Sequence, residues 1–174
     1  SLSIDDYRAS ERTFDLLVQV AGRAGREKLP GNVIIQTYNP DNYSIQYSKK
    51  QNYEEFYNVE IKLRKQLRYP PFCDIIMFGI SGEREEIVSK TANQLYANLH
   101  KKIQQEDIAA NILKPLPAPI DKIKNRYRWR IIIKSEVNDK LIEIINECLY
   151  DKELLKNNAR VIADINPTNM MWFL

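Results

Sequence analysis

Strand-like and helix-like segments alternate between residues 74 and 166 in the order strand, helix, strand, strand, helix, strand. Helical spacing is clearest where Val88, Ala92, Leu95, Leu99 and Ile103 recur every three to four residues. The expected strands cover residues 74–81, an extended segment from 112, 127–135 and 160–166, and the expected helices cover 83–105 and 138–150. A turn-rich stretch with three prolines covers 115–119. This order restricts the chain to few folds and predicts an α+β, ferredoxin-like βαββαβ domain, an antiparallel sheet with two helices on one face.

The sequence Tyr69-Pro70-Pro71-Phe72 marks the start of this domain. Aromatic and charged residues at helical spacing precede it over 43–67. Proline cannot donate to a helix ladder and disfavours the helical region for the residue before it. We therefore predict a connecting helix or pair of helices within 41–69 and a separate domain at 70–174.

The first 40 residues contain a helix over 10–23 and a β-branched strand over 33–37, separated by a turn at Leu29-Pro30-Gly31. This strand has no partner nearby in the sequence. Because one isolated strand cannot form a sheet, residues 1–40 are expected to be the trailing edge of a larger α/β domain that lies mostly upstream.

Residues 19–26 read Gln-Val-Ala-Gly-Arg-Ala-Gly-Arg. If the helix continues through them, Gln19, Arg23 and Arg26 share one stripe, at i, i+4 and i+7, opposite the apolar residues around Phe14. A planar guanidinium is well suited to phosphate oxygens. This stripe is therefore a candidate nucleotide-phosphate contact, and ordinary surface salt bridges are the alternative.

Basic residues are concentrated between Lys114 and Lys134. Seven lysines and arginines and one aspartate give this segment a net charge of +6, so the rest of the chain carries −3 because the whole carries +3. A local basic stripe on a slightly acidic body is typical of a phosphate contact, although solvated lysine-rich loops look similar. The candidate DNA- and partner-binding residues are Lys122, Lys124, Arg126, Arg128 and Arg130.

Side chains alternate along the strand expected at 127–135. The arginines at 126, 128 and 130 therefore share one face, which we expect to be exposed to solvent, with the two lysines in the loop before it. Tyr127 and Trp129 share the other face with isoleucines, which favours core packing over base stacking. The alternative for the arginines is a charged edge strand that prevents aggregation.

Several separated motifs resemble one family. Residues 19–26 resemble motif VI of the superfamily 2 helicases, and the chain from about residue 5 to its end is similar to the C-terminal part of the PriA-type replication-restart DNA helicases (primosomal protein N′). The resemblance rests on residues 6–12, 31–40, Tyr69-Pro70-Pro71-Phe72 and Arg126-Tyr127-Arg128-Trp129. It implies that residues 1–40 end the second, RecA-like helicase lobe and that 70–174 form an S10-like C-terminal domain.

The resemblance also implies roles and ligands. Arg26 would be an arginine finger for the γ-phosphate of ATP, with Arg23 and Gln19 helping to sense it. ATP and Mg²⁺ would bind the full-length helicase and Zn²⁺ only a region upstream. The chain shows no phosphate-binding loop of the GxxxxGK[ST] type and no cysteine cluster, so we expect no metal site here and neither ATP hydrolysis nor DNA unwinding by these residues alone.

The partners that the resemblance implies are forked or single-stranded DNA, the acidic C-terminal tail of single-stranded DNA-binding protein, and other primosome proteins. Arg126 and Arg130, on one face near Ile132, are candidates to clamp a carboxylate of that tail. The alternative function is a stand-alone interaction module without any link to ATP. No apolar run of about 18 residues occurs, so we expect a cytoplasmic protein with no membrane contact. We also expect a monomer. Cys73 and Cys148 are far apart and belong to no cluster, so we expect them to be buried thiols.

Overall fold

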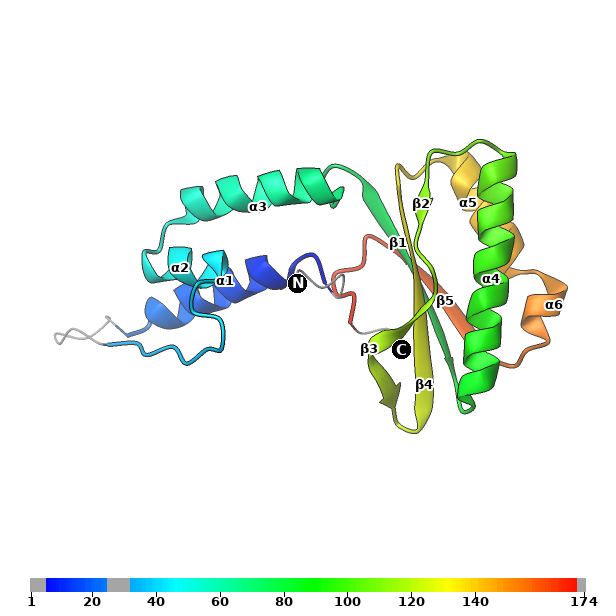
Figure 1. Ribbon diagram of the computed structural model, residues 1–174, viewed down its shortest axis with the longest axis horizontal. Coiled ribbons are helices and arrows are strands. Elements are labelled where there is room, and N and C mark those ends of the chain that lie inside the picture. Colours follow the sequence, from blue (N-terminus) through cyan, green and yellow to red (C-terminus); the bar gives the residue numbers. More distant parts are fainter. Residues whose placement is uncertain (1–5, 25–31, 172–174) are drawn as a thin grey trace. The chain divides into compact units, whose positions relative to one another are not determined.

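The computed structural model describes residues 6–24 and 32–171, and the chain divides between Leu67 and Arg68 (Figure 1). We call Asp6–Leu67 the helical unit and residues 68–171 the sheet unit. The structure is therefore mixed α/β, with a small antiparallel sheet. It does not separate 1–40 from 41–69, because described residues of both segments pack in the helical unit.

Three helices build the helical unit: α1 (Ala9–Ala21), α2 (Tyr43–Lys49) and α3 (Tyr53–Leu67). Their core is aromatic, since the rings of Phe14 and Phe56 stack with their centroids 4.2 Å apart and both are buried. Around this core, the Tyr43 hydroxyl donates to Glu60 Oε2 at 2.6 Å, and Arg64 bridges Glu60 and Glu11 at 2.7 and 2.5 Å. The expected connecting segment is thus a pair of helices, α2 and α3.

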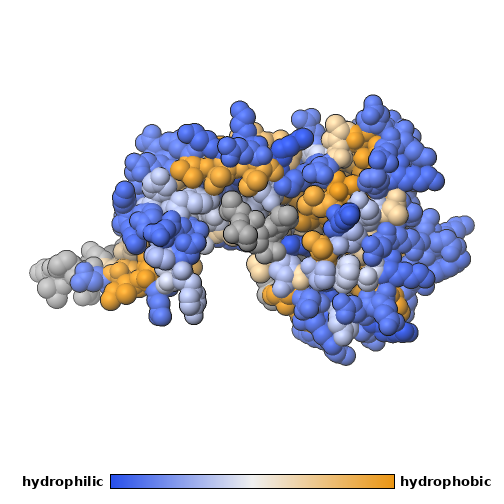
Figure 2. Space-filling view, viewed as in Figure 1, coloured by the Kyte–Doolittle hydropathy of each residue, from blue (hydrophilic) through white to orange (hydrophobic). Residues whose placement is uncertain are grey.

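The strand expected over 33–37 is wrong, because these residues have no regular secondary structure. The side chain of Ile34 is 93% exposed and that of Val33 is 39% exposed. The described part of the helical unit contains no strand with which 33–37 could pair, and an unpaired strand leaves its backbone groups to solvent. Figure 2 shows hydrophobic surface in this part of the unit.

The sheet unit alternates strands and helices as the sequence predicts, and it has two additional elements, a strand over Leu116–Ile123 and a short helix over Lys152–Leu155. Its elements are β1 (Asp74–Gly82), α4 (Glu85–Gln105), β2 (Asn111–Ile112), β3 (Leu116–Ile123), β4 (Arg126–Ser135), α5 (Asp139–Leu149), α6 (Lys152–Leu155) and β5 (Arg160–Ile165). The short helix α6 was not expected. The proline-rich stretch is not a turn, because most of it lies in β3, which pairs with β4 through a register shift.

The sheet is antiparallel throughout, with strand order β2-β4-β1-β5, and β3 also pairs with β4. One face of β1 and β4 carries Ile76, Phe78, Ile131 and Ile133, which pack with α4 and α5 in the main core. The helices therefore cover one face only, as Figure 1 shows. The opposite face carries Ile75 and Met77, both buried, beside Ile132 and the arginines of β4.

A network of hydrogen bonds joins the ends of three elements in this unit. The Asp74 carboxylate accepts from the backbone N–H of Val137 at 2.9 Å and from Asn166 Nδ2 at 2.8 Å. Asn166 in turn accepts from the Ile75 N–H through its side chain and donates its own N–H to the Ile75 carbonyl. These bonds hold the pKa of Asp74 below its ordinary value, first through Asn166 and then through Val137.

Candidate nucleic-acid interface

A tight hairpin presents the first two basic candidates. β3 ends at Ile123 and β4 begins at Arg126, so Lys124 and Asn125 alone form the turn, with φ of 49° and 61°. Two successive positive φ values are the requirement of a type I′ hairpin turn, whose twist suits antiparallel strands. Lys122 and Lys124 are both exposed. The hairpin therefore places two lysines at one end of the sheet.

Lys122 is positioned by its partner across the ladder. It lies opposite Tyr127, and its Nζ donates to the Tyr127 hydroxyl at 3.2 Å and lies 4.4 Å from the ring centroid. The ring thus directs the ammonium group without neutralising its charge, because a cation above an aromatic face keeps its positive charge. Lys122 is in β3 and not in a loop, contrary to the sequence expectation.

Arg126 lies at the same end of the sheet, and a further arginine joins it there. Arg126 is half-buried, and its Nη2 donates to the Ser81 carbonyl at 3.4 Å. Ser81 is opposite Arg128 on one side and Arg160 on the other, so Arg160, which is exposed, shares the face of the arginines. Sequence analysis missed Arg160. The sequence places Arg160 at the start of an expected strand. Its position beside the other arginines depends on pairing with Ser81, which is 79 positions away in the sequence.

Arg128 and Arg130 share one face, as predicted, but they do not face solvent. They are 3% and 6% exposed. Arg128 donates to the carbonyls of Ile120 and Met171, both at 3.1 Å, and Arg130 donates to the carbonyl of Met170 at 3.3 Å. Met170 is fully buried. Residues 170 and 171 therefore cover the two arginines on this face of the sheet, and burial lowers the pKa of Arg128.

This arrangement also changes the interpretation of the whole strand. β4 is central, with β1 on one side and β2 and β3 on the other, so it is not a charged edge strand. The clamp of Arg126 and Arg130 does not form as a solvent-open pair, because Arg130 is bound to a backbone carbonyl. Tyr127 and Trp129 pack against the main core, which confirms the core interpretation.

Lys134 ends the basic row on the same face of β4. Its Nζ lies 3.6 Å from the ring centroid of Tyr69, which is buried. Burial lowers the pKa of Lys134, and the neighbouring Cys73 opposes that change. Both cysteines are buried free thiols, as predicted, and burial raises the pKa of Cys148 to about 11.

The described part of the motif, residues 19–24, lies at the end of α1 and in the turn after it. Gln19 is exposed on the last turns of the helix, and Arg23 is exposed in the turn that follows. Phe14 is buried on the opposite side, as the pattern predicts. Arg26 lies outside the described residues. The structure thus leaves two of the three candidate side chains open to solvent.

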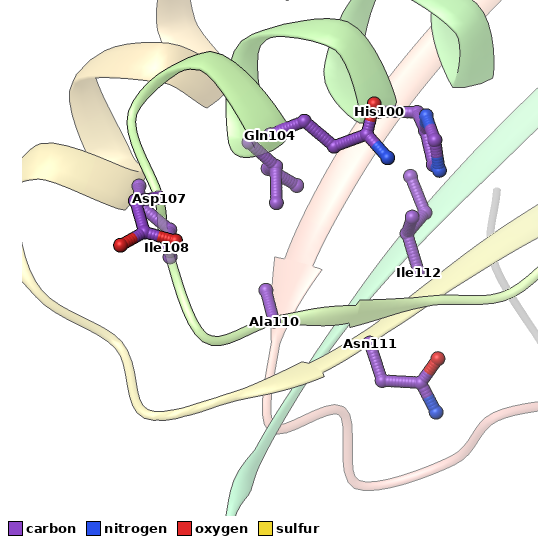
Figure 3. Close-up of a pocket in the computed structure, with 8 residues that line it drawn as sticks. His100, Gln104, Asp107, Ile108, Ala110, Asn111 and Ile112 are labelled. Carbon is purple, nitrogen blue, oxygen red and sulfur yellow. The ribbon is translucent and has the colours of Figure 1, made fainter.

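A surface pocket of about 400 Å³ lies between the end of α4 and β2 (Figure 3). His100, Ile103, Gln104 and Ile112 are among the residues that line it. The His100 ring lies 5.6 Å from that of Tyr96. Within residues 6–24 and 32–171, no three His, Cys, Asp or Glu side chains lie together as a metal-binding group. No helix in these ranges has the length and apolar character to cross a membrane.

Comparison with known proteins identifies the sheet unit. Residues 65–168 match the family model described as Primosomal protein N C-terminal domain. The chain is 38% identical over 173 residues to the Replication restart protein PriA of Bacillus subtilis (strain 168), covering 98% of this chain and 21% of that protein. Proteins of the same name from Synechocystis sp. and Borreliella burgdorferi are 37% and 36% identical, with 97% and 95% of this chain and 20% and 24% of those proteins covered.

The chain thus spans about a fifth of the length of the Bacillus subtilis and Synechocystis relatives that it matches. The matched family model covers more than half of the chain and contains β1 through β5 with the whole basic hairpin. The chain belongs to the primosomal protein N C-terminal domain family, and its curated relatives are PriA replication restart proteins.

Proposed function

We propose that this chain is the C-terminal part of a PriA-type replication-restart DNA helicase and that its sheet unit binds forked or single-stranded DNA. The observation that carries the proposal is the basic end of the sheet, where Lys122 and Lys124 are exposed on the hairpin with Arg126 and Arg160 beside them. Charges held on a sheet can contact successive phosphates without ordering a loop. In Figure 2 this end of the unit is mostly hydrophilic.

The fold supports the finer assignment that the sequence predicted. A strand order of β2-β4-β1-β5 with α4 and α5 on one face is the arrangement of a ferredoxin-like domain, to which β3 adds a hairpin. We propose that the sheet unit is ferredoxin-like and S10-like. We propose likewise that residues 1–40 end a RecA-like lobe, because Val33 and Ile34 expose apolar surface that a completed lobe would cover. A self-contained interaction module would not need that surface.

The motif at 19–26 is proposed to sense ATP in the full-length helicase. Gln19 and Arg23 are exposed within one turn of each other, and an exposed guanidinium fits a phosphate oxygen. We propose Arg26 as the arginine finger that contacts the γ-phosphate of ATP. ATP, Mg²⁺ and Zn²⁺ would bind with other parts of the longer protein, so the 174-residue chain alone is not expected to hydrolyse ATP or to unwind DNA. ATP turnover by the purified chain would contradict this.

The experiment for DNA binding compares two charge-matched variants. Lys122→Glu with Lys124→Glu reverses the hairpin lysines, and Lys49→Glu with Lys50→Glu reverses two exposed lysines of the helical unit. Fluorescence anisotropy with labelled forked DNA should show a large loss for the hairpin variant only. For this variant the slope of log K against log salt concentration should also be less steep, by the amount that about two phosphate contacts contribute. Equal losses in both variants would assign the binding to net charge and refute a hairpin site.

An acidic peptide with the composition of the tail of single-stranded DNA-binding protein tests the second proposed partner. If the hairpin binds both ligands, the peptide should compete with forked DNA, and the hairpin variant should lose both. If the peptide binds the hairpin variant normally, the tail site lies elsewhere. Binding of DNA and peptide with wild-type affinity by the hairpin variant would refute the proposed surface.

A further inference from the structure

The two edges of the sheet differ in how well they are protected. β2 and β3 form one edge, where Pro117 lies opposite Trp129 and has no N–H to offer to another strand. β5 forms the other edge, because no described strand lies beyond it. Its six residues include no proline, and Ala163, Asp164 and Ile165 are exposed. An edge of this kind can pair with a further strand.

The register shows which backbone groups of β5 are open. The Asn166 N–H donates to the Ile75 carbonyl at 2.7 Å, so Ile75 and Asn166 occupy a hydrogen-bonded position of the β1–β5 ladder. These positions alternate in an antiparallel pair. Arg160, Ile162 and Asp164 therefore direct their backbone groups towards β1. Val161, Ala163 and Ile165 direct their N–H and C=O groups outward.

The side chains of Arg160, Ile162 and Asp164 make this edge complementary to the same edge of a second copy. In antiparallel pairing with a second β5, Val161 of each chain can exchange hydrogen bonds with Ala163 of the other. Ile162 then lies opposite its own copy, and Arg160 lies opposite Asp164 twice, on the same face. A shift by two residues removes both opposite-charge pairs. We infer that the open edge of β5 binds the β5 strand of a second copy of this chain in this register.

This inference concerns self-association and is tested without DNA, so it does not rest on the proposed DNA binding. It predicts a dimer where the sequence analysis expects a monomer. The two surfaces share Arg160, whereas Lys122 and Lys124 belong to the other edge. A single pair of six-residue strands buries less than a standard interface, so the dimer should be weak, with a Kd on the order of 100 µM. The symmetric contact closes as a two-fold dimer and leaves no repeating edge.

Charge reversal tests the register in solution. Sedimentation velocity of the 174-residue chain from about 10 to about 500 µM should show a concentration-dependent dimer. Arg160→Asp and Asp164→Arg should each raise the dimer Kd by about tenfold, because each replaces two attractive pairs by two repulsive ones. The double variant restores both pairs in reverse and should dimerise like the wild type. Far-UV circular dichroism checks that each variant folds.

Cysteine crosslinking tests the same register without changing a charge. Ile162→Cys places two thiols directly opposite each other, at a separation that a disulfide can bridge, whereas Ile165→Cys is exposed but out of register. Mild oxidation should therefore crosslink the first variant and not the second. A chain that stays monomeric over the whole range, equal crosslinking of both variants, or a dimer that the double variant fails to restore would overturn the inference.

Discussion

Replacing Asp74 by alanine should destabilise the sheet unit by about 2 kcal/mol at neutral pH. The carboxylate accepts two hydrogen bonds, from the Val137 N–H and from Asn166 Nδ2, which join the ends of β1, β4 and β5. Each bond to a charged group contributes about 1.5 kcal/mol or more when buried, and Asp74 is only half-buried, so about 1 kcal/mol each is the appropriate value.

The effect should depend on pH with a definite sign. The folded state lowers the pKa of Asp74 below its ordinary value of 3.8, so its contribution is present above that value and is lost as the pH falls through the folded-state pKa. The difference between the wild type and Asp74→Ala should thus be full at about pH 7 and should shrink below about pH 4. Urea unfolding at several pH values measures it through the midpoint at constant m.

Two further variants isolate the cause of this effect. Asp74→Asn keeps the shape of the side chain but replaces one acceptor oxygen by an NH2 donor. It should therefore lose at least half of the stabilisation, and the part that remains should not depend on pH. Asp121→Ala removes an exposed aspartate of β3 and should change stability by less than about 0.5 kcal/mol. An equal loss for Asp74→Ala at low and neutral pH would refute the reasoning, since a protonated carboxyl cannot accept both bonds as a carboxylate does.

Three other changes have defined outcomes. Phe14→Ala removes a buried ring that stacks on Phe56 and should destabilise the helical unit by about 3 to 5 kcal/mol in urea unfolding followed by near-UV circular dichroism; a loss below about 1 kcal/mol would contradict its core position. Gly82→Ala places a Cβ 2.9 Å from Cγ2 of Val88 and should lower the free energy of unfolding by about 1 to 3 kcal/mol, measured by urea unfolding; an unchanged free energy of unfolding would mean that the contact relaxes. Tyr43 donates to a carboxylate, and burial first and this bond second raise its pKa to about 12. Its stabilisation is therefore present below its ordinary pKa of 10.0 and is lost as the pH rises through about 12, so Tyr43→Phe should remove a tyrosine transition near pH 12 from an ultraviolet absorbance titration.

The sequence predicted the sheet unit well because its signals are local. Residues such as Val88, Leu95 and Leu99 are spaced for one helical face, and all are buried in α4. The parity of Tyr127 and Trp129 with the isoleucines of β4 likewise indicated the core face correctly. Periodicity succeeds here because burial against a neighbouring layer produces it.

Other features depend on partners distant in the sequence, and there prediction failed. Composition suggested a strand at 33–37, but a strand needs a partner that the described helical unit does not contain. The prolines of 115–119 suggested a turn, but proline is tolerated on an edge strand where its missing N–H faces solvent. Arg160 joins the basic end only through its pairing with Ser81.

The arginines of β4 show how charge counting overestimates a binding surface. Arg128 and Arg130 carry two of the seven positive charges between Lys114 and Lys134, yet both are buried. They donate to the backbone carbonyls of Ile120, Met170 and Met171. A buried guanidinium is tolerated only where acceptors replace its water, and carbonyls of Met170 and Met171 supply them. The same bonds hold the terminal segment on the sheet face that the helices leave uncovered. DNA phosphates would have to displace this segment to reach either arginine. The DNA contact should therefore be confined to the hairpin end, and its salt dependence should report about four charges, those of Lys122, Lys124, Arg126 and Arg160, rather than the seven that the sequence suggests.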